Sequence, residues 1–211
     1  MVKKVIHQIV GRNSNFLIER CLRSWDVLKN EGFEVKIWTD QSIQRFIEKI
    51  FPFAYEALIN ARNYAEAADI ARYLIVYHYG GYYMDWDIEL LDAHRFLTIC
   101  KEVKKGFLII DSFNGTLASE CFSAQQGEPF LYALSQEIIQ IYRSGNRKYY
   151  KTPQYSGPYR MREALKKHQN PKQKLIEVND IFLYNYREIR QMPLKERKAP
   201  LIHYWVHGWL S

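Results

Sequence analysis

The chain has 211 residues, of which 47% are hydrophobic and 25% are charged, and its formal net charge is +7. This length and composition favour one globular domain with its own core and argue against an intrinsically disordered chain. The cysteines Cys21, Cys100 and Cys121 are widely spaced and lack any C-x-x-C pairing. This spacing argues against a disulfide framework or a structural zinc site and favours a reducing, cytoplasmic setting.

The first residues predict a strand rather than a signal peptide. Residues 4–9 (KVIHQI) are mostly apolar, but His7 and Gln8 interrupt them and no small-residue cleavage site follows. Charged residues also break the most apolar region of the chain, so no window approaches the roughly 18 apolar residues of a transmembrane helix. We therefore expect a soluble or peripheral protein.

The N-terminal part predicts a β-α-β unit. Residues 4–9 and 33–38 have strand patterns, and residues 15–29 between them place apolar side chains at helical spacing. A β-α-β unit predicts a parallel sheet covered by helices, and hence an α/β fold.

The remaining elements follow from periodicity and from the positions of Gly and Pro. The longest helix is expected to end at Gly80-Gly81, whose role would be to let the backbone turn. In order, we expect helices at 41–50, 52–61 and 63–79, strands at 82–84, 88–91 and 107–110, helices at 129–143 and 157–167, a loop at 145–156, and strands at 175–178 and 181–183.

Positive charge is concentrated in residues 143–198, which contain 15 Lys or Arg and 5 Asp or Glu, whereas the rest of the chain is net negative. This composition is compatible with an anionic membrane lipid, a nucleic acid, or a phosphorylated or sugar partner. A solvated basic face without a partner is the alternative. Seven tyrosines lie in or beside this segment: Tyr142, Tyr149, Tyr150, Tyr155, Tyr159, Tyr184 and Tyr186.

The pattern with most chemical content is Asp85-Trp86-Asp87, directly after the strand expected at 82–84. Residues i and i+2 of a strand lie on the same face, and where the strand ends and the chain turns both carboxylates can converge on one cation. A few oxygen ligands with open positions suit Mn²⁺ or Mg²⁺ bound together with a diphosphate leaving group. A D-x-D on its own is too common to indicate a function.

Several other stretches of the chain accompany this D-x-D. They are Ala68-Asp69-Ile70-Ala71-Arg72-Tyr73-Leu74, residues 79–87 (YGGYYMDWD), the opening residues 4–9, Trp25, Trp38-Thr39-Asp40, Ser156-Gly157-Pro158 and the tail at 203–209 (HYWVHGW). Together they resemble glycosyltransferase family 32, a group of DXD-containing sugar-transfer enzymes. The resemblance implies a GT-A fold, a divalent cation, a nucleotide-sugar donor and usually retention of the anomeric configuration.

The resemblance also implies roles for the acidic and basic residues of this stretch. Asp87 would coordinate the metal, and Asp85 would contact the donor ribose or reach the ion through water. Asp69 and Arg72 would face the donor and bind its sugar hydroxyls and phosphate. Their spacing alone would equally fit a surface ion pair at i, i+3. These four residues form the expected catalytic group.

The C-terminal tail is expected to close the site. His203 would be a further metal ligand, with His207 as the rival, and either could instead be a structural histidine. Trp209 would bind a phosphate through its indole N–H, close the site, or pack on the core. Gly208 stands where the family often has serine.

The opening strand would contribute a wall of the nucleotide pocket through His7 and Gln8, although a histidine in an apolar strand is more often a hydrogen-bonded core residue. Val10 follows Ile9 where the family often has an aromatic residue. The ring that stacks on the nucleotide base is therefore expected either to be missing or to be supplied by Trp38 or another residue.

Together these features predict one domain, 1–211, with a nucleotide-sugar and metal core at 1–142, a basic acceptor-side segment at 143–198 and a closing tail at 199–211. The expected reaction is metal-dependent transfer of a hexose from a UDP- or GDP-sugar to a glycan or an undecaprenyl-diphosphate-linked acceptor. The expected setting is bacterial surface-polysaccharide (capsule) synthesis in the cytoplasm or at the inner face of the membrane, with no nucleic-acid partner. No Asp or Glu stands out as a nucleophile. The alternatives are a non-catalytic module that binds nucleic acid or an anionic surface, and a metal-dependent phosphohydrolase.

Overall fold

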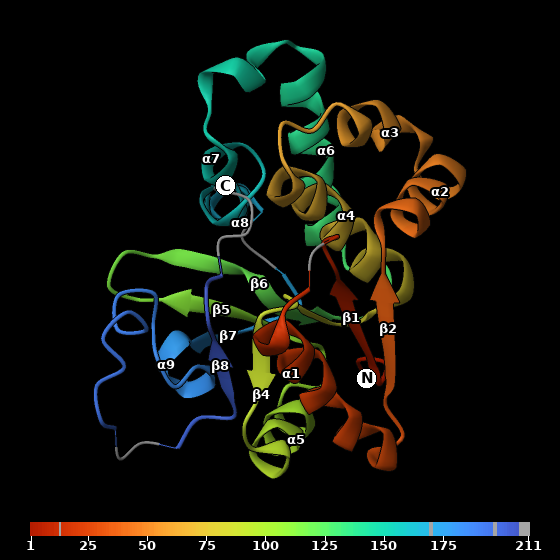
Figure 1. The fold of residues 1–211 in the computed structure, drawn as a ribbon. Coiled ribbons are helices and arrows are strands. Elements are labelled where there is room, and N and C mark those ends of the chain that lie inside the picture. Colours follow the sequence, from red (N-terminus) through yellow and green to blue (C-terminus); the bar gives the residue numbers. More distant parts are fainter. Residues whose placement is uncertain (13, 169–170, 196–197, 207–211) are drawn as a thin grey trace.

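A computed structural model describes residues 1–12, 14–168, 171–195 and 198–206. They form a six-stranded sheet in the order β2-β1-β3-β6-β5-β7 with helices on both faces (Figure 1). β1 is parallel to β2 and β3, and β7 is parallel to β5, whereas β6 is antiparallel to both neighbours. The expected α/β fold with a mainly parallel sheet is confirmed. The strands are β1 (Val5–Ile9), β2 (Glu34–Trp38), β3 (Gly81–Met84), β5 (Phe107–Asp111), β6 (Thr116–Ala124) and β7 (Lys174–Glu177).

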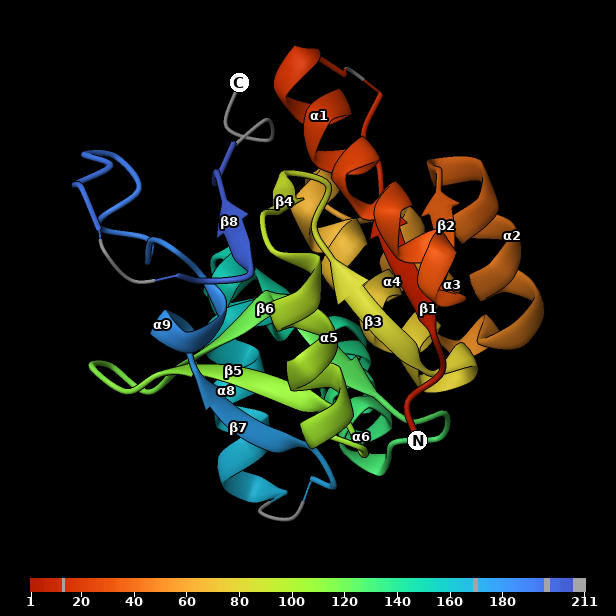
Figure 2. The same cartoon turned by 90° about the horizontal axis from the view of Figure 1, so that it is seen from below.

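The two faces of the sheet are covered by different helices (Figures 1 and 2). The strand period of two separates the side chains into two cores, so that Tyr83 packs in one core and its neighbour Tyr82 in the other. The first core contains α2 (Asp40–Ile50), α3 (Pro52–Ile59), α4 (Tyr64–Tyr79), α6 (Pro129–Arg143) and α8 (Pro158–Lys167). The second contains the 3₁₀ helix η1 (Trp25–Glu31), α5 (Ala93–Glu102) and α9 (Val178–Ile181).

A second, two-stranded sheet brings the end of the described chain to the middle of the molecule. β4 (Ile88–Leu90) pairs antiparallel with β8 (Leu201–His203), with Ile88 opposite His203. The indole N–H of Trp25 donates to the carbonyl of Ile88 at 3.0 Å and so ties β4 to η1. Helix α1 (Phe16–Ser24) packs against β4.

Two elements differ from the sequence predictions in type. The strand expected at 181–183 is wrong, because Ile181 ends a helical turn at 178–181 that the Phe182 amide closes on the Val178 carbonyl, and Phe182 makes only an isolated bridge to Leu201. The buried pair Ile181 and Phe182 fits a strand or a helical turn equally well, so the sequence pattern of this short run could not separate the two. The loop expected at 145–156 contains the 3₁₀ helix η2 (Asn146–Tyr149) and α7 (Thr152–Tyr155).

The connection from α4 to β3 depends on Gly81. Its φ is +110°, and a Cβ there would lie 2.5 Å from the carbonyl oxygen of Val5 in the neighbouring β1. Only glycine fits at this approach. The turn allows one of the best-defined helices to run directly into a central strand, so residues of α4 and the end of β3 lie near each other. Across the part of the chain that the structure describes, no helix is long and apolar enough to cross a membrane.

Candidate active site

The D-x-D lies in the turn between β3 and β4. The Ile88 amide donates to the Asp85 carbonyl at 3.1 Å and closes this turn. His203 enters from the partner strand β8, opposite Ile88. As a result, Asp85, Asp87 and His203 offer ligand atoms that all lie within 4.8 Å of one another.

The tail after β8 encloses Asp87. Its Oδ1 lies 3.2 Å from Nε2 of His203, and its Oδ2 accepts a 2.7 Å hydrogen bond from the Val206 amide. Its carbonyl accepts from the Tyr204 amide at 3.1 Å. Between these two amides, Trp205 has a left-handed backbone with φ +46°, and its ring centroid lies 4.1 Å from that of His203. Such backbone positions are costly for a residue with a Cβ and are concentrated at functional sites.

The pKa values of Asp87 and His203 indicate which of the two carries the proton. Burial would lower the pKa of His203, but the neighbouring Asp87 carboxylate raises it to about 10. Burial would raise the pKa of Asp87, but the charge and hydrogen bond of His203 and the Val206 amide lower it. In the absence of a cation the pair is therefore an imidazolium and a carboxylate. A divalent cation can take the place of the Nε2 proton, and a set of two carboxylates and one imidazole suits Mn²⁺.

Arg72 lies between two of the expected site carboxylates. Its Nη2 is 3.4 Å from Asp69 Oδ1, and its Nη1 is 3.4 Å from Asp85 Oδ1. Nη1 also donates to the Ser119 carbonyl at 2.8 Å. Asp69 and Arg72 are each only 5% exposed, so they are not a surface ion pair. The Tyr83 hydroxyl donates to Asp85 Oδ1 at 2.7 Å and fixes that carboxylate further.

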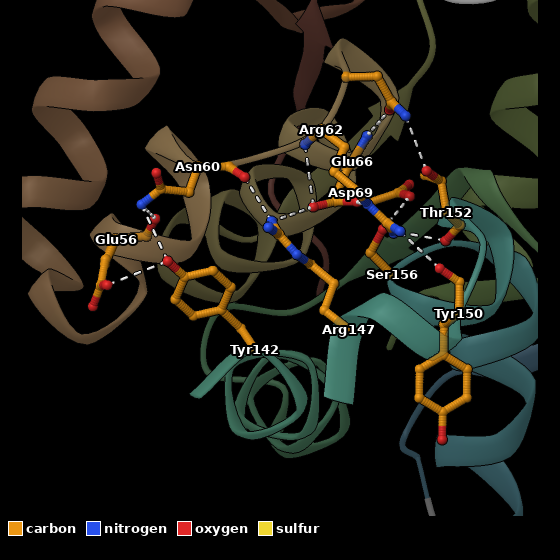
Figure 3. A network of polar contacts seen from close by, with 11 residues as sticks. Glu56, Asn60, Arg62, Glu66, Asp69, Tyr142, Arg147, Tyr150, Thr152 and Ser156 are labelled. Atoms are coloured by element: carbon orange, nitrogen blue, oxygen red, sulfur yellow. Dashed lines mark hydrogen bonds and ion pairs between the residues drawn. The ribbon is translucent and has the colours of Figure 1, made fainter. Parts of the chain in front are cut away.

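Asp69 links α4 to the segment around α7. Its Oδ2 accepts a 2.8 Å hydrogen bond from the Ser156 hydroxyl (Figure 3). A Cβ on the next residue, Gly157, would lie 3.2 Å from the same oxygen, which explains why the smallest residue stands there. Burial raises the pKa of Asp69 to about 7, against the opposing effects of Arg72 and Ser156.

The D-x-D, His203, Asp69 and Arg72 line one large cavity of about 1120 Å³. Ligand pockets usually measure about 300–1,000 Å³, so this cavity is large enough for an extended ligand such as a nucleotide sugar. Its charged lining is predominantly acidic where the D-x-D lies, which suits a cation. The residues concerned are Asp69, Arg72, Asp85, Asp87, Glu120 and His203.

The structure does not bring His7, Gln8 and Trp38 to this cavity, because all three are buried in the core. His7 Nε2 donates to the Gly80 carbonyl at 2.9 Å, and the Trp38 indole donates to His7 Nδ1 at 3.2 Å. Burial lowers the pKa of His7 to about 4, so this histidine is neutral. Among the described residues, neither amide atom of Gln8 has a partner. The aromatic rings that line the cavity instead are Tyr64, Tyr83, Trp86, Tyr159, Tyr186 and Trp205.

Two expected site residues of the tail, His207 and Trp209, lie outside the described residues, as does Gly208. His203 lies beside the D-x-D, and the choice between His203 and His207 as the metal ligand stays a prediction.

Glu120 was not predicted as a site residue. Its Oε1 lies 3.7 Å from Nδ1 of His203, on the side away from Asp87. It belongs to β6, which was not predicted either. The only hint in the sequence was that Glu120 is the single charged residue in the nine-residue stretch TLASECFSA.

Part of the chain is similar in sequence to known glycosyltransferases. Residues 16–102 match the family described as "Glycosyltransferase sugar-binding region containing DXD motif". Inositol phosphoceramide mannosyltransferase 1 of Schizosaccharomyces pombe is 29% identical over 164 residues, which are 72% of this chain and 46% of that protein. Mannosyl phosphorylinositol ceramide synthase SUR1 of Saccharomyces cerevisiae is 39% identical over 51 residues, 24% of this chain and 13% of that protein. The chain thus spans less than half the length of the curated relatives it matches.

A solved structure shares the fold. PaToxG glycosyltransferase superposes with a TM-score of 0.59 at 18% identity, covering 79% of this chain and 70% of that one. The family match contains Asp69, Arg72, Asp85 and Asp87, which the structure places on one cavity wall. Residues 16–102 of this chain therefore match the family of DXD-containing glycosyltransferases, and most of the chain shares its fold with a solved glycosyltransferase.

Proposed function

We propose that this chain is a metal-dependent hexosyltransferase that uses a nucleotide-sugar donor. The observation that carries the proposal is the convergence of Asp85, Asp87 and His203 within 4.8 Å on the wall of a cavity large enough for the donor. The names of the two yeast relatives favour mannose as the sugar and an inositol-phosphate lipid as the acceptor. A glycan or an undecaprenyl-diphosphate-linked lipid, as in bacterial surface-polysaccharide synthesis, is the alternative acceptor.

The contacts of the site residues support a proposed role for each. Mn²⁺ or Mg²⁺, when bound, would offset the negative charge that develops on the departing nucleoside diphosphate. Asp87 and His203 would hold the ion, and Asp85 would join them or contact the donor. Arg72 provides a second positive charge beside Asp85, at the depth of the cavity where a diphosphate would meet it. Asp69, with one oxygen on Ser156, can accept a hydrogen bond from a sugar hydroxyl.

We further propose that the anomeric configuration is retained. The acceptor hydroxyl oxygen would bond to the anomeric carbon on the face from which the sugar–phosphate bond breaks. The hydroxyl proton would pass to an oxygen of the departing diphosphate. This route needs no protein nucleophile. The two carboxylates of the D-x-D and the neighbouring carboxylates of Asp69 and Glu120 each already have a protein partner. Product stereochemistry by NMR tests it.

The reaction is tested by nucleotide release. The protein is incubated with Mn²⁺ and a panel that includes GDP-mannose, UDP-glucose and UDP-galactose, and the freed nucleoside diphosphate is measured. We expect slow release from one donor, which EDTA and Asp87→Asn abolish. Intact donors throughout, together with no binding of GDP or UDP in the presence of Mn²⁺, would contradict the proposal. Cleavage of free nucleotides with no need for a sugar would favour a phosphohydrolase instead.

A further inference from the structure

A second cavity, of about 480 Å³, adjoins the first within the basic segment. Asn114, Thr116 and Tyr159 line both cavities, so the two lie side by side at this edge. One ligand could therefore place one of its groups in the second cavity and another in the first. The remaining residues that line it are Tyr150, Gln154, Arg160, Arg162 and Glu163.

Arg160 brings a buried and incompletely paired charge to this cavity. The residue is only 9% exposed, and its Nε donates to the Gln154 carbonyl at 3.2 Å. Its nearest carboxylate, on Glu137, is 4.0 Å from Nη1. Glu137 also pairs with Lys167 at 3.3 Å and with His168 at 3.1 Å. The guanidinium has five N–H donors, and within the described part of the chain one of its hydrogen bonds is made.

Arg162 adds a second guanidinium. Its Nε donates to Glu163 Oε1 at 3.1 Å, and its Nη1 makes a long 3.4 Å contact with the Asn114 carbonyl. Glu163 shares its charge with Lys166, also at 3.1 Å. The cavity wall therefore carries two guanidinium groups and one carboxylate that is already paired with a lysine outside the cavity, so its charge favours an anion.

Aromatic rings hold the two guanidinium groups in place. Arg160 lies over the ring of Tyr150 at 5.4 Å, and Arg162 lies over the ring of Tyr159 at 5.3 Å. These cation–π contacts limit the rotation of both side chains without using their N–H groups. The N–H groups of Arg160 and Arg162 that do not already donate to Gln154, Glu163 or Asn114 remain available for a ligand.

A buried polar network fixes this wall relative to α4 (Figure 3). Arg62 pairs with the fully buried Glu66 at 2.7 Å, and its Nη1 donates to the Tyr150 carbonyl at 2.8 Å. The Asn63 side chain donates to the Thr152 hydroxyl at 3.0 Å. α4 also carries Asp69 and Arg72, so the second cavity has a fixed position relative to the first.

We propose that this second cavity binds a phosphodiester group of the acceptor, through Arg160 and Arg162, while the acceptor hydroxyl reaches the first cavity. Two guanidinium groups on one wall match the oxygens of a phosphate better than lysines would, because each can form a pair of parallel hydrogen bonds. The tyrosine rings offer apolar faces to the alcohol on either side of the phosphate. The inference rests on the proposed function, since it names the acceptor class of the same reaction.

The test uses glycerophosphoinositol as a soluble phosphodiester probe and myo-inositol as its counterpart without phosphate. Binding to the full chain is measured by calorimetry in the presence of Mn²⁺ and GDP, for the wild type, Arg162→Gln and the control Lys148→Gln. Lys148 belongs to the same basic segment but is exposed and does not line the cavity. We expect the wild type to bind the phosphodiester and not inositol, Arg162→Gln to weaken binding about tenfold or more, and Lys148→Gln to change it less than twofold.

A second arm separates the acceptor phosphate from the diphosphate of the donor. The affinity for GDP with Mn²⁺ should be the same in the wild type and in Arg162→Gln. If Arg162→Gln weakens GDP as much as the phosphodiester, or if the wild type does not bind the phosphodiester, the inference is wrong. Arg160→Lys gives a second variant that keeps the charge of a buried residue, and its melting curve shows whether it folds. Loss of the bidentate geometry should weaken the probe in this variant as well.

The inference and the proposed function can fail separately. Binding of the probe does not require a donor to react, so it is measured even if no donor is cleaved. Donor hydrolysis without an acceptor should be unchanged by the control Lys148→Gln, which lies outside the cavity. A protein that cleaves a donor but ignores the probe would overturn the acceptor site alone.

Discussion

Helix α4 carries two buried charge clusters of opposite arrangement. In the first, Glu66 lies between two cations, with Arg62 at 2.7 Å and Arg147 at 3.0 Å, and its side chain is fully buried. In the second, Arg72 lies between Asp69 and Asp85, each at 3.4 Å.

The surroundings of the two clusters differ more than their charges do. Glu66 does not line the large cavity, and its short contacts join α4 to η2 and to the loop before α4. The Arg72 cluster lines the cavity, has longer contacts and continues into the carboxylates of Asp87 and Glu120. We infer that the first cluster is complete within the protein and stabilises the fold, whereas the second has an excess of carboxylates that a bound cation would balance.

The largest effect should come from breaking the complete cluster. Glu66→Gln leaves two arginines without their shared carboxylate, and removal of one partner from a buried pair costs about 3–5 kcal/mol. Urea unfolding measures the change. Glu19→Gln, which breaks an exposed pair with Arg23, is the matched control and should change the unfolding free energy by less than about 1 kcal/mol. Equal stabilities for the two variants would remove the distinction between the clusters.

The second effect should appear in activity rather than stability. Asp87→Asn should lower Mn²⁺-dependent nucleotide release by about 10²–10³-fold, because it removes a proposed metal ligand and the partner of His203. Its melting temperature should fall less than that of Glu66→Gln. Asp26→Asn, an exposed acid paired with Lys29, should leave the rate unchanged. If Asp87→Asn lost both nucleotide release and the folded state, Asp87 would be a structural residue.

The third effect is a dependence of stability on pH. The folded pKa of Asp69, about 7, lies above its ordinary value of 3.8. The native state therefore keeps the proton between these pH values while the unfolded state releases it, so this group lowers the unfolding free energy as pH rises from about 4 to 7. In EDTA, Asp69→Asn should gain stability relative to the wild type over this range, by on the order of 1 kcal/mol or more. Parallel pH curves would contradict the shift.

The smallest effect should come from the hydroxyl that connects the Arg72 cluster to α7. Ser156→Ala removes one hydrogen bond to Asp69 and should cost about 1 kcal/mol in unfolding free energy. It should also reduce donor cleavage several-fold. Ser135→Ala removes a buried hydroxyl that bonds only within its own helix, to the Leu131 carbonyl, and serves as the control. If both variants reduce cleavage alike, Ser156 has no special connection to the site.

The part of the site that local sequence patterns predict is the part close together along the chain. The strand-end position of Asp85-Trp86-Asp87 and the helix that carries Asp69 and Arg72 followed from spacing and from the Gly80-Gly81 stop. The family resemblance added His203 from the far end of the sequence. The structure places these residues together, while their functional roles stay predictions.

The rest depended on pairings that no local pattern reveals. Glu120 reaches His203 only because β6 pairs antiparallel with β3, and β6 lacks the clean alternation of a half-exposed strand. His7 and Trp38 were expected at the nucleotide, but the parallel pairing of β1 with β2 places their side chains under α2 and α4, where they bond to each other. Burial on both faces of a central strand explains why polar residues of β1 do not reach the cavity.

The pairing of β4 with β8 leads us to expect that the proposed metal site forms late in folding. The contact between Asp87 and the Val206 amide joins residues 119 positions apart and therefore closes a long loop of the chain. Contacts of such separation pay a large loop-closure entropy before they stabilise anything. The carboxylates of the D-x-D turn are local and can assemble early, whereas we expect the imidazole to arrive last. Manganese affinity would therefore report the arrival of β8, and a refolding experiment followed by metal binding would detect the final step of the fold.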